Sequence, residues 1–481
     1  MSGVPKFVSS FTQSLSEIFE TSGIRGFPIS SRSIKVLLNP DEFYNTLIAQ
    51  VAQSKKRVTM SSLYLGTGDL EEKLVSTVNE SLRKEPELQV KWFLDKGRGC
   101  RKVRGKSSSG MLSPLCVEHG ERHQVYLYTP VLSENLITQF LPPRWNEILS
   151  KSSFDNQWKG VYHIKSYIFD NNMIISGANL SHDYFTNRID RYVLFENCAD
   201  LIGLYEKFFS ILASYCSYIT STGAIHGYLS SKKTHQQFCS EVKSLLHTKE
   251  NFSIPTKDSD VMVYPTFQQE ALNLTCDYDA FKRVLELANR FTDIDLFLTS
   301  GYVNFPPEVV ELLTSFKGEM KFLFAAPQAN SFFHDPGFAS VIPALYNILQ
   351  CNFFHRCKEK SANTCFLEYL NKNWTYHSKG LWLFRKNSPE SLVTIGSPNF
   401  GMRSYFRDME SQLYMISESP NYILSDSLLK LFENETDHRF HDKDTMEVSA
   451  ALFDSPERFP PHCPLEPAKL GYFLRMMQGL L

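Results

Sequence analysis

The stretch "YHIKSYIFDNNMIISGANLS", residues 162 to 181, contains a histidine and a lysine two positions apart within a run of β-branched and aromatic residues. The "DNN" tripeptide in its middle is a strong turn signal, so the stretch predicts a β-hairpin. Residues i and i+2 of a strand share a face, and His163 and Lys165 are therefore expected to present an imidazole and an ammonium group to one point. A single pair of this kind is common on protein surfaces, where it is usually just solvated.

A second copy of the stretch argues against a pair that is merely solvated at the surface. Residues 375 to 415, "TYHSKGLWLFRKNSPESLVTIGSPNFGMRSYFRDMESQLYM", repeat the order strand, turn, strand and glycine-containing loop seen in residues 161 to 195, and His377 and Lys379 repeat the pair. The repeat extends upstream, as strand 56–66, helix 69–82 and strand 88–95 in one half and strand 292–302, helix 306–316 and strand 319–327 in the other. Short crossovers of this kind favour parallel or mixed sheets covered by helices, an α/β fold.

The repeat also divides the chain. A polar stretch interrupted by Gly and Ser lies between the two copies and marks a boundary. We therefore predict four parts: an N-terminal extension (1–35), a first lobe with His163 and Lys165 (36–225), a linker (226–260), and a second lobe with His377 and Lys379 (261–481).

Composition excludes several classes of protein. The 481 residues are 42% hydrophobic and 21% charged, as in ordinary globular proteins, and a net charge of -2 does not favour a nucleic-acid-binding protein. Ten cysteines without a CxxC pair argue against a disulfide scaffold, and the group Cys351, His355, Cys357 and Cys365 lacks the spacing of a zinc site. No apolar run approaches the ~20 residues that a membrane-spanning helix needs.

Two imidazoles and two ammonium groups suit a phosphate or phosphodiester. Lysines neutralise phosphoryl oxygens, while one neutral imidazole can attack phosphorus and the other can transfer protons. Four further residues at matching places in the two copies can add amide and hydroxyl groups: Ser176, Asn179, Ser397 and Asn399.

An acid also recurs at the same distance in both copies. Asp190 lies eleven residues after Asn179, and Glu410 lies eleven residues after Asn399. A carboxylate that accepts a hydrogen bond from one ring nitrogen fixes the tautomer and leaves the other nitrogen free for chemistry. Four polar positions in one order, found twice, indicate a duplicated catalytic motif.

These residues resemble the duplicated H-x-K-x4-D motifs of the phospholipase D superfamily. The first copy comprises His163, Lys165, Asp170, Gly177 and Asn179, and the second His377, Lys379, Gly396, Ser397 and Asn399. Within that superfamily the chain, from about residue 35 onward, is similar to the eukaryotic phosphatidylglycerophosphate synthases. It departs from the pattern at Phe384, where the second motif expects an aspartate that mainly supports the motif structurally.

The resemblance implies two phospholipase D-like α/β/α sandwich lobes with mixed sheets, related by a pseudo-twofold axis, and one active site at their interface. It implies metal-independent transfer of the phosphatidyl group of CDP-diacylglycerol to glycerol 3-phosphate, with no cofactor. His163 would be the nucleophile that forms a phosphatidyl-histidine, and His377 the general acid and base. Lys165 and Lys379 would hold phosphoryl oxygens, with Asp190 and Glu410 orienting the imidazoles. Asp170 is placed with the catalytic group.

The resemblance also implies where the protein works and what it contacts. We expect a peripheral enzyme on the matrix side of the mitochondrial inner membrane that touches anionic lipid and binds no nucleic acid. The rivals are phospholipase D hydrolysis and phosphatidylserine or cardiolipin synthesis on the same scaffold, a nuclease or phosphodiesterase, and an inactive lipid-binding scaffold.

Several weaker features of the sequence each allow two interpretations. The basic stretch 95–110 is either a solvated loop or a site for substrate phosphates or anionic lipid. The tail 470–481 either caps the core or anchors the protein at an interface. Arg188, Arg191, Arg403 and Arg407 either pair with nearby acids or face substrate phosphates. The loop that could contact the cytidine diphosphate moiety comprises Ser61, Ser62, Leu63, Tyr64, Leu65, Gly66, Thr67 and Gly68.

Overall fold

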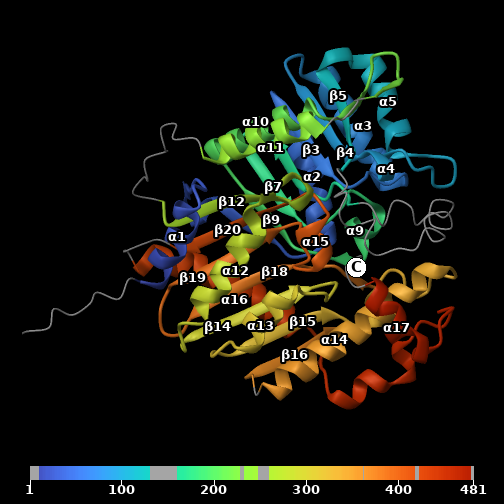
Figure 1. Ribbon diagram of the computed structural model, residues 1–481. Coiled ribbons are helices and arrows are strands. Elements are labelled where there is room, and N and C mark those ends of the chain that lie inside the picture. The colour runs from blue at the N-terminus through green and yellow to red at the C-terminus, as the bar shows by residue number, and fades with distance from the viewer. Residues whose placement is uncertain are drawn as a thin grey trace, which may run out of the picture.

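The computed structural model describes residues 10–130, 160–227, 232–247, 259–360, 362–417, 422–477 and 481. Within these residues the chain forms two large mixed sheets, one in each half of the sequence (Figure 1). The nine-stranded sheet has the order β11-β10-β5-β4-β3-β6-β7-β9-β2, and the ten-stranded sheet has the order β1-β12-β20-β19-β18-β14-β15-β16-β21 with β13 paired to β12. We call each sheet with its helices the first lobe and the second lobe.

The two sheets repeat one topology. In the first lobe β3 (Arg57–Ser62), β4 (Gln89–Asp95) and β5 (His123–Tyr128) are parallel, and β6 (Ser166–Phe169), β7 (Asn172–Ser176) and β9 (Tyr192–Phe195) continue antiparallel from β3. In the second lobe β14 (Ile294–Ser300), β15 (Met320–Ala325) and β16 (Thr364–Tyr369) match the parallel part, and β18 (Gly380–Arg385), β19 (Ser391–Gly396) and β20 (Glu410–Ser417) match the antiparallel part. The predicted α/β fold with mixed sheets is confirmed.

Helices cover both faces of each sheet because each sheet has apolar residues on both sides. The outer face of the first sheet packs on α2 (Pro40–Gln53), α3 (Asp69–Lys84) and α5 (Ser108–His119). The outer face of the second packs on α1 (Phe11–Thr21), α12 (Cys276–Ala288), α13 (Pro307–Thr314) and α14 (Val341–Glu359). The predicted helices 69–82 and 306–316 are α3 and α13.

The inner faces of the two sheets share one core. This core includes residues of both sheets together with α10 (Ala199–Ala213), α11 (Lys232–Leu246) and α16 (Tyr422–Phe440). Phe208 of α10 stacks on Phe267 of β12 (Val261–Gln269) with ring centroids 4.0 Å apart. The lobes therefore join through apolar packing, which holds the ends of their central strands in fixed register.

Two predicted boundaries need correction. Residues of the expected N-terminal extension complete the second lobe, because α1 packs in its core and β1 (Phe27–Ile29) pairs with β12. The next strand along the chain, β2 (Ile34–Leu37), pairs with β9 and belongs to the first sheet. The expected linker begins at the last residue of β11 (Ile225–His226) of the first sheet and contains α11, whose Phe238 and Val242 are buried in the shared core. Amphipathic spacing in a polar segment is easily overlooked, and this explains the error.

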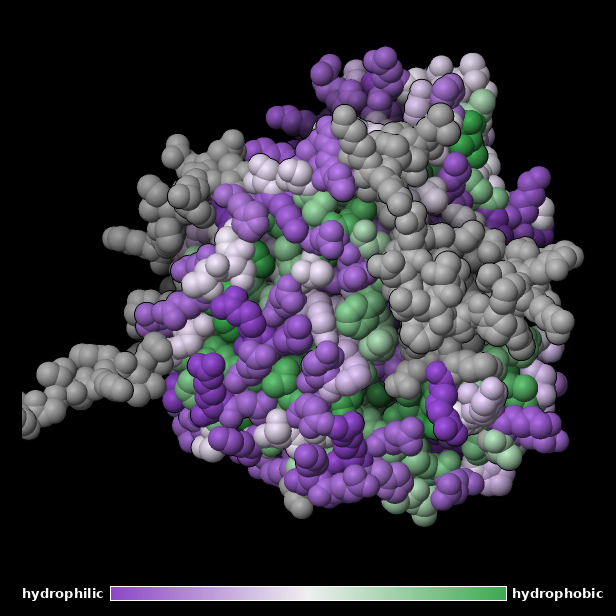
Figure 2. All heavy atoms as spheres, in the orientation of Figure 1, coloured by the Kyte–Doolittle hydropathy of each residue, from purple (hydrophilic) through white to green (hydrophobic). Residues whose placement is uncertain are grey.

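The outer surface is mainly polar. On the face shown in Figure 2, hydrophilic side chains cover most of the described surface, and hydrophobic ones appear between them as separate patches. None of the helices within the described residues has both the length and the apolar character to cross a bilayer. In the tail, Leu470 and Leu474 of α17 (Pro467–Met477) pack on α14, whereas Tyr472 is 67% exposed.

Candidate active site

The two His-x-Lys segments lie immediately before strands rather than within them. His163 and Lys165 precede β6, and His377 and Lys379 precede β18. The expectation of a regular strand at these residues is therefore wrong by a few positions. The segments leave their own sheets because their backbones bond to the opposite lobe instead.

Each His-x-Lys segment pairs with the residues just before the acid of the other lobe. Tyr162 forms a parallel bridge with Met409, and the His163 N–H donates to the Met409 carbonyl at 2.8 Å. In the second copy, β17 (Thr375–Tyr376) pairs in parallel with β8 (Arg188–Ile189), and the His377 N–H donates to the Ile189 carbonyl at 2.8 Å. The two pairings are equivalent and bring each histidine beside the acid that follows its partner strand.

The acids are therefore exchanged between the lobes. Nδ1 of His163 lies 3.0 and 2.9 Å from the two carboxylate oxygens of Glu410, and Nδ1 of His377 lies 2.6 Å from Oδ2 of Asp190. Both carboxylates are fully buried. When Nδ1 carries the proton, it donates to the carboxylate and Nε2 keeps the lone pair. In His377 this tautomer competes with Lys379, whose Nζ lies 2.8 Å from the same Nδ1.

Each of the two lysines holds the backbone of its own histidine segment through a hydrogen bond. Lys165 Nζ donates to the His163 carbonyl at 2.7 Å, and Lys379 Nζ donates to the His377 carbonyl at 2.6 Å. Lys379 Nζ also lies 3.5 Å from Oδ2 of Asp190. A Cβ atom at Gly177 would lie 2.5 Å from an Asp190 oxygen and 2.6 Å from Lys379 Nζ, so the glycine is required for this close approach.

Burial and the lysine charges keep both imidazoles neutral. Burial and the Lys165 ammonium lower the pKa of His163 well below its ordinary value. Burial and Lys379 lower the pKa of His377 to about 3, although Asp190 acts in the opposite direction. Burial also lowers the pKa of Lys165 to about 7. An anionic phosphodiester in the site would favour the charged forms of these groups.

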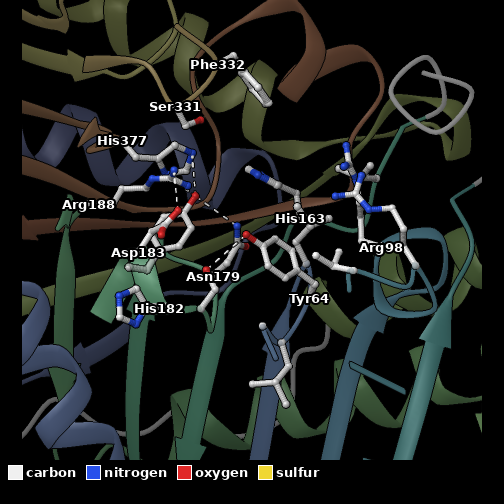
Figure 3. A pocket seen from close by; sticks show the side chains of 18 of the residues that line it. Tyr64, Arg98, His163, Asn179, His182, Asp183, Arg188, Ser331, Phe332 and His377 are labelled. Atoms are coloured by element: carbon white, nitrogen blue, oxygen red, sulfur yellow. Dashed lines mark hydrogen bonds and ion pairs between the residues drawn. The ribbon is translucent and has the colours of Figure 1, made fainter. Parts of the chain in front are cut away.

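One cavity of about 950 Å³ contains both histidines, which come from different lobes. Figure 3 shows His163 and His377 in its wall with Asn179 between them. Asn399 also lines the cavity, and the side-chain oxygens of Asn179 and Asn399 are buried with no hydrogen-bond partner among the described residues. Because an unpaired buried polar atom costs free energy, its presence at equivalent positions in both lobes indicates a place for a polar ligand.

Asp170 lies outside this site, which corrects its placement with the catalytic group. It is not among the residues that line the cavity. Its carboxylate accepts hydrogen bonds of 2.9, 2.9 and 3.0 Å from the backbone N–H groups of Lys55, Lys56 and Arg57, at the start of β3. Its φ of 48° places it in the turn between β6 and β7. Asp170 is a structural residue.

Phe384 has a different position in its hairpin. β18 continues to Arg385, so Phe384 lies inside the strand and packs against Phe297 with ring centroids 5.8 Å apart. An aspartate here would be buried among apolar residues instead of capping a turn. The substitution therefore changes the support of the second hairpin and leaves the cavity wall untouched.

Some of the remaining predicted residues line the cavity, and others hold the backbone around it in place. Leu63 to Gly68 line the cavity, whereas Ser61 bonds to the Tyr162 hydroxyl and the Ile164 carbonyl, and Ser62 to the Tyr64 carbonyl. Ser176 donates to the Arg191 carbonyl at 2.7 Å, and Ser397 donates to the Ser411 carbonyl at 3.3 Å. These four serines hold the loops that carry the site. The basic stretch contributes Arg98, Arg101, Arg104 and Lys106 to the cavity wall.

Arg191 joins the lobes instead of facing the cavity. Its guanidinium makes two 2.8 Å contacts with the Glu435 carboxylate of α16 and donates to the Lys379 and Thr394 carbonyls. Burial alone would raise the pKa of Glu435, but Arg191 and Arg439 lower it to about 2. Replacing Glu435 would leave the buried Arg191 guanidinium without its acid and cost about 3–5 kcal/mol.

The two tyrosines that contact the His377 ring were not predicted. Tyr184 of α9 (His182–Thr186) contacts the edge of the His377 ring, with centroids 5.3 Å apart, and accepts a hydrogen bond from Asn179 at 3.3 Å. Tyr302 lies 5.7 Å from the same imidazole. The sequence contains a signal for Tyr302, since "TSGY" (299–302) spans the end of β14 as "SSLY" (61–64) spans the end of β3.

Comparison with known proteins identifies the family. The chain is 33% identical over 437 residues to the CDP-diacylglycerol--glycerol-3-phosphate 3-phosphatidyltransferase, mitochondrial, of Gallus gallus, covering 82% of this chain and 76% of the relative. The chain belongs to the CDP-diacylglycerol--glycerol-3-phosphate 3-phosphatidyltransferases. The human protein of that name is 31% identical over 479 residues (90% and 81% coverage), and the Saccharomyces pastorianus one is 30% identical over 449 (86% and 83%). No family model matches the chain.

A solved structure supports the fold. The phosphatidylserine synthase of Haemophilus influenzae superposes with a TM-score of 0.73 over 97% of this chain and 98% of its own, at 17% identity. The two-lobed phospholipase D-like fold predicted for this family member is therefore confirmed. Such low identity says nothing about the acceptor that this phosphatidyltransferase uses.

The exchange of acids between lobes makes a testable prediction. Glu410→Gln is expected to impair the chemistry of His163, and Asp190→Asn that of His377, because each amide would stabilise the wrong tautomer of the imidazole it contacts. Each variant should lower kcat by roughly 10²–10⁴-fold. In double variants, Glu410→Gln should add little to His163→Ala, and Asp190→Asn little to His377→Ala. Additive losses within these pairs, measured in steady-state assays, would contradict the exchange.

Proposed function

We propose that this family member transfers the phosphatidyl group of CDP-diacylglycerol to glycerol 3-phosphate through a phosphatidyl-histidine on His163. The acceptor and donor are those in the names of its relatives. The observation that supports the covalent route is the pair of neutral imidazoles from different lobes in one cavity, each fixed by the acid of the other lobe.

In the first step, Nε2 of His163 attacks the phosphatidyl phosphorus. A P–N bond forms, the P–O bond to CMP breaks, and CMP leaves with the electron pair. Glu410 stabilises the positive charge that develops on the imidazole, as its contacts with Nδ1 allow. The Asn179 and Asn399 amides, which line the cavity, would bond to the substrate, and the charges of Lys165 and Lys379, which lie behind the histidine segments, would stabilise the negative charge of the phosphoryl oxygens.

In the second step, His377 takes the proton from a glycerol 3-phosphate hydroxyl, whose oxygen attacks phosphorus. The P–N bond breaks and its electron pair returns to His163. An anionic substrate would raise the low pKa of His377, since negative charge stabilises the imidazolium. Two inversions at phosphorus produce net retention of configuration.

The test is an acceptor competition. Purified protein with labelled CDP-diacylglycerol in excess chelator is expected to form phosphatidylglycerophosphate from glycerol 3-phosphate faster than it forms products from serine, glycerol or water. Loss of activity in chelator would contradict the proposed mechanism. A faster reaction with water would indicate a phospholipase, and a faster one with serine a phosphatidylserine synthase.

We propose that the cavity meets an anionic membrane at the basic stretch. Residues 101–106 are exposed, and a Val103–Lys106 bridge closes a turn in which Arg104 and Gly105 have positive φ. Val103 at this turn is 49% exposed beside three basic residues that line the cavity. An apolar tip with surrounding cations fits an anionic bilayer surface, and the lipid substrate would enter there. Because the Gallus gallus and Homo sapiens relatives are named mitochondrial, we propose the mitochondrial inner membrane, on its matrix side.

Vesicle binding tests this surface. Lys102→Gln with Arg104→Gln is expected to weaken binding to vesicles of anionic lipid roughly tenfold or more, since each surface cation contributes about 1 kcal/mol. The matched control is Lys55→Gln with Lys56→Gln, also exposed, at the opposite end of β3. Equal losses in both double variants would assign the effect to net charge and contradict a local docking surface.

A further inference from the structure

Arginines near the two motifs differ in their partners. Arg191 is paired with Glu435, and Arg403, which also lines the cavity, donates to the buried Asp408 at 2.9 Å. Arg188 lies in the cavity wall, next to His377 in Figure 3. We infer that Arg188 forms a subsite for the phosphate monoester of the acceptor, so that it selects glycerol 3-phosphate over acceptors without a phosphate. This inference rests on the proposed function.

The geometry of the reaction places the acceptor on the side of Arg188. In-line displacement puts the entering and leaving groups on opposite sides of phosphorus. When His163 attacks from one side, CMP leaves toward His377, and the acceptor hydroxyl later enters from that same side. The acceptor phosphate is separated from this hydroxyl by three carbon atoms, so we place it within that reach, on the His377 side of phosphorus.

Arg188 lies on the His377 side of the cavity and is held there by several contacts. Its guanidinium lies 4.7 Å from the centre of the Tyr184 ring, and the Tyr184 ring lies 5.3 Å from that of His377. Its Nε donates to Thr375 Oγ1 of the other lobe at 2.9 Å, and its side chain is only 12% exposed. A guanidinium fixed in this way loses little conformational freedom when it binds a phosphate through two hydrogen bonds.

Asp183 is the one acid that the guanidinium contacts within the described residues. Arg188 Nη2 donates to Asp183 Oδ2 at 3.2 Å, and the Asp183 side chain is 54% exposed. Such a solvated pair contributes little to stability. A phosphate at Arg188 would compete with this carboxylate and be repelled by it. The two residues should therefore affect acceptor binding in opposite directions.

The experiment compares Arg188→Gln, Arg188→Lys and Asp183→Asn with two readouts in the full-length protein. The first is kcat/KM for glycerol 3-phosphate, with glycerol and water as acceptors without a phosphate. The second is the burst of CMP released from CDP-diacylglycerol without acceptor, which reports folding and the first step. Arg188→Gln should lower kcat/KM for glycerol 3-phosphate by between roughly 10- and 100-fold. It should leave the reactions with glycerol and water and the CMP burst within about threefold of the wild type.

The other variants separate recognition from structure. Arg188→Lys should recover part of the loss, and Asp183→Asn should lower KM for glycerol 3-phosphate. If the ion pair only holds α9 and β8 in place, Asp183→Asn will impair the protein as Arg188→Gln does, and the inference fails. It also fails if Arg188→Gln lowers the CMP burst or affects all acceptors equally. Failure of the proposed function looks different, because the wild type would then release no CMP burst.

Discussion

His163→Ala is expected to abolish both turnover and the release of CMP in a single cycle. Among the histidines that line the cavity, His163 is the one whose Nδ1 is bonded to a buried carboxylate of the second lobe. Its Nε2 is the nitrogen available to attack phosphorus. Without the nucleophile, the P–O bond to CMP has no covalent route for its cleavage. We expect kcat to fall by at least ~10³-fold, a loss of the size found when a nucleophile is removed.

The measurement is the amount of CMP released per protein molecule within the first turnover. Label in the phosphatidyl phosphate should stay on wild-type protein as an acid-labile, base-stable adduct and be absent from the variant. His441→Ala is the matched control, since His441 is exposed and pairs only locally, with Asp437 of α16. A labelled adduct on the His163→Ala protein would move the nucleophile to another residue.

His377→Ala is expected to stop turnover while leaving the first half-reaction in place. CMP is a phosphate monoester with a second pKa near ~6, so it leaves without much help from a general acid. The acceptor hydroxyl is far less acidic and needs a base, which in this site is His377 held by Asp190 at 2.6 Å. We therefore expect one CMP per active site, accumulation of phosphatidyl-His163, and kcat lowered by at least ~10³-fold.

The contrast between the two histidine variants is the informative result. Both imidazoles contact a buried carboxylate of the other lobe through Nδ1, so this contact alone does not decide which of them is the nucleophile. If His377→Ala blocks the burst and His163→Ala retains it, the roles are reversed. If both retain steady turnover, neither imidazole is the nucleophile.

Local sequence patterns were sufficient for the elements and for most of the site. Alternating apolar residues and the turn at "DNN" predict the hairpin of β6 and β7, and the repeat predicts β18 and β19. The His, Lys, Asn and acidic residues could be found because the motif occurs twice, and duplication is visible without any structure. Tyr184 has no such signal, because it lies on a short helix that has no special spacing relative to the motif.

Patterns of this kind could not show which residues act structurally. Asp170 and Phe384 occupy the same position of the motif, five residues after a lysine, yet one caps a turn and the other packs in a core. The difference depends on the length of each hairpin. A longer β18 carries the position inside the strand, where only an apolar side chain packs without a desolvation cost.

The sequence by itself determined the α/β elements, the two copies of the motif and the identities of the histidines, lysines and acids. Only the tertiary structure decided that Glu410 serves His163 and Asp190 serves His377, since each pair joins different lobes and the first spans 247 residues. The physical reason is the range of the interactions. The residue preferences of turns and the spacing of hydrophobic residues act over a few positions of the chain. The Tyr162–Met409 and β8–β17 pairings instead depend on how two entire sheets pack around one shared core.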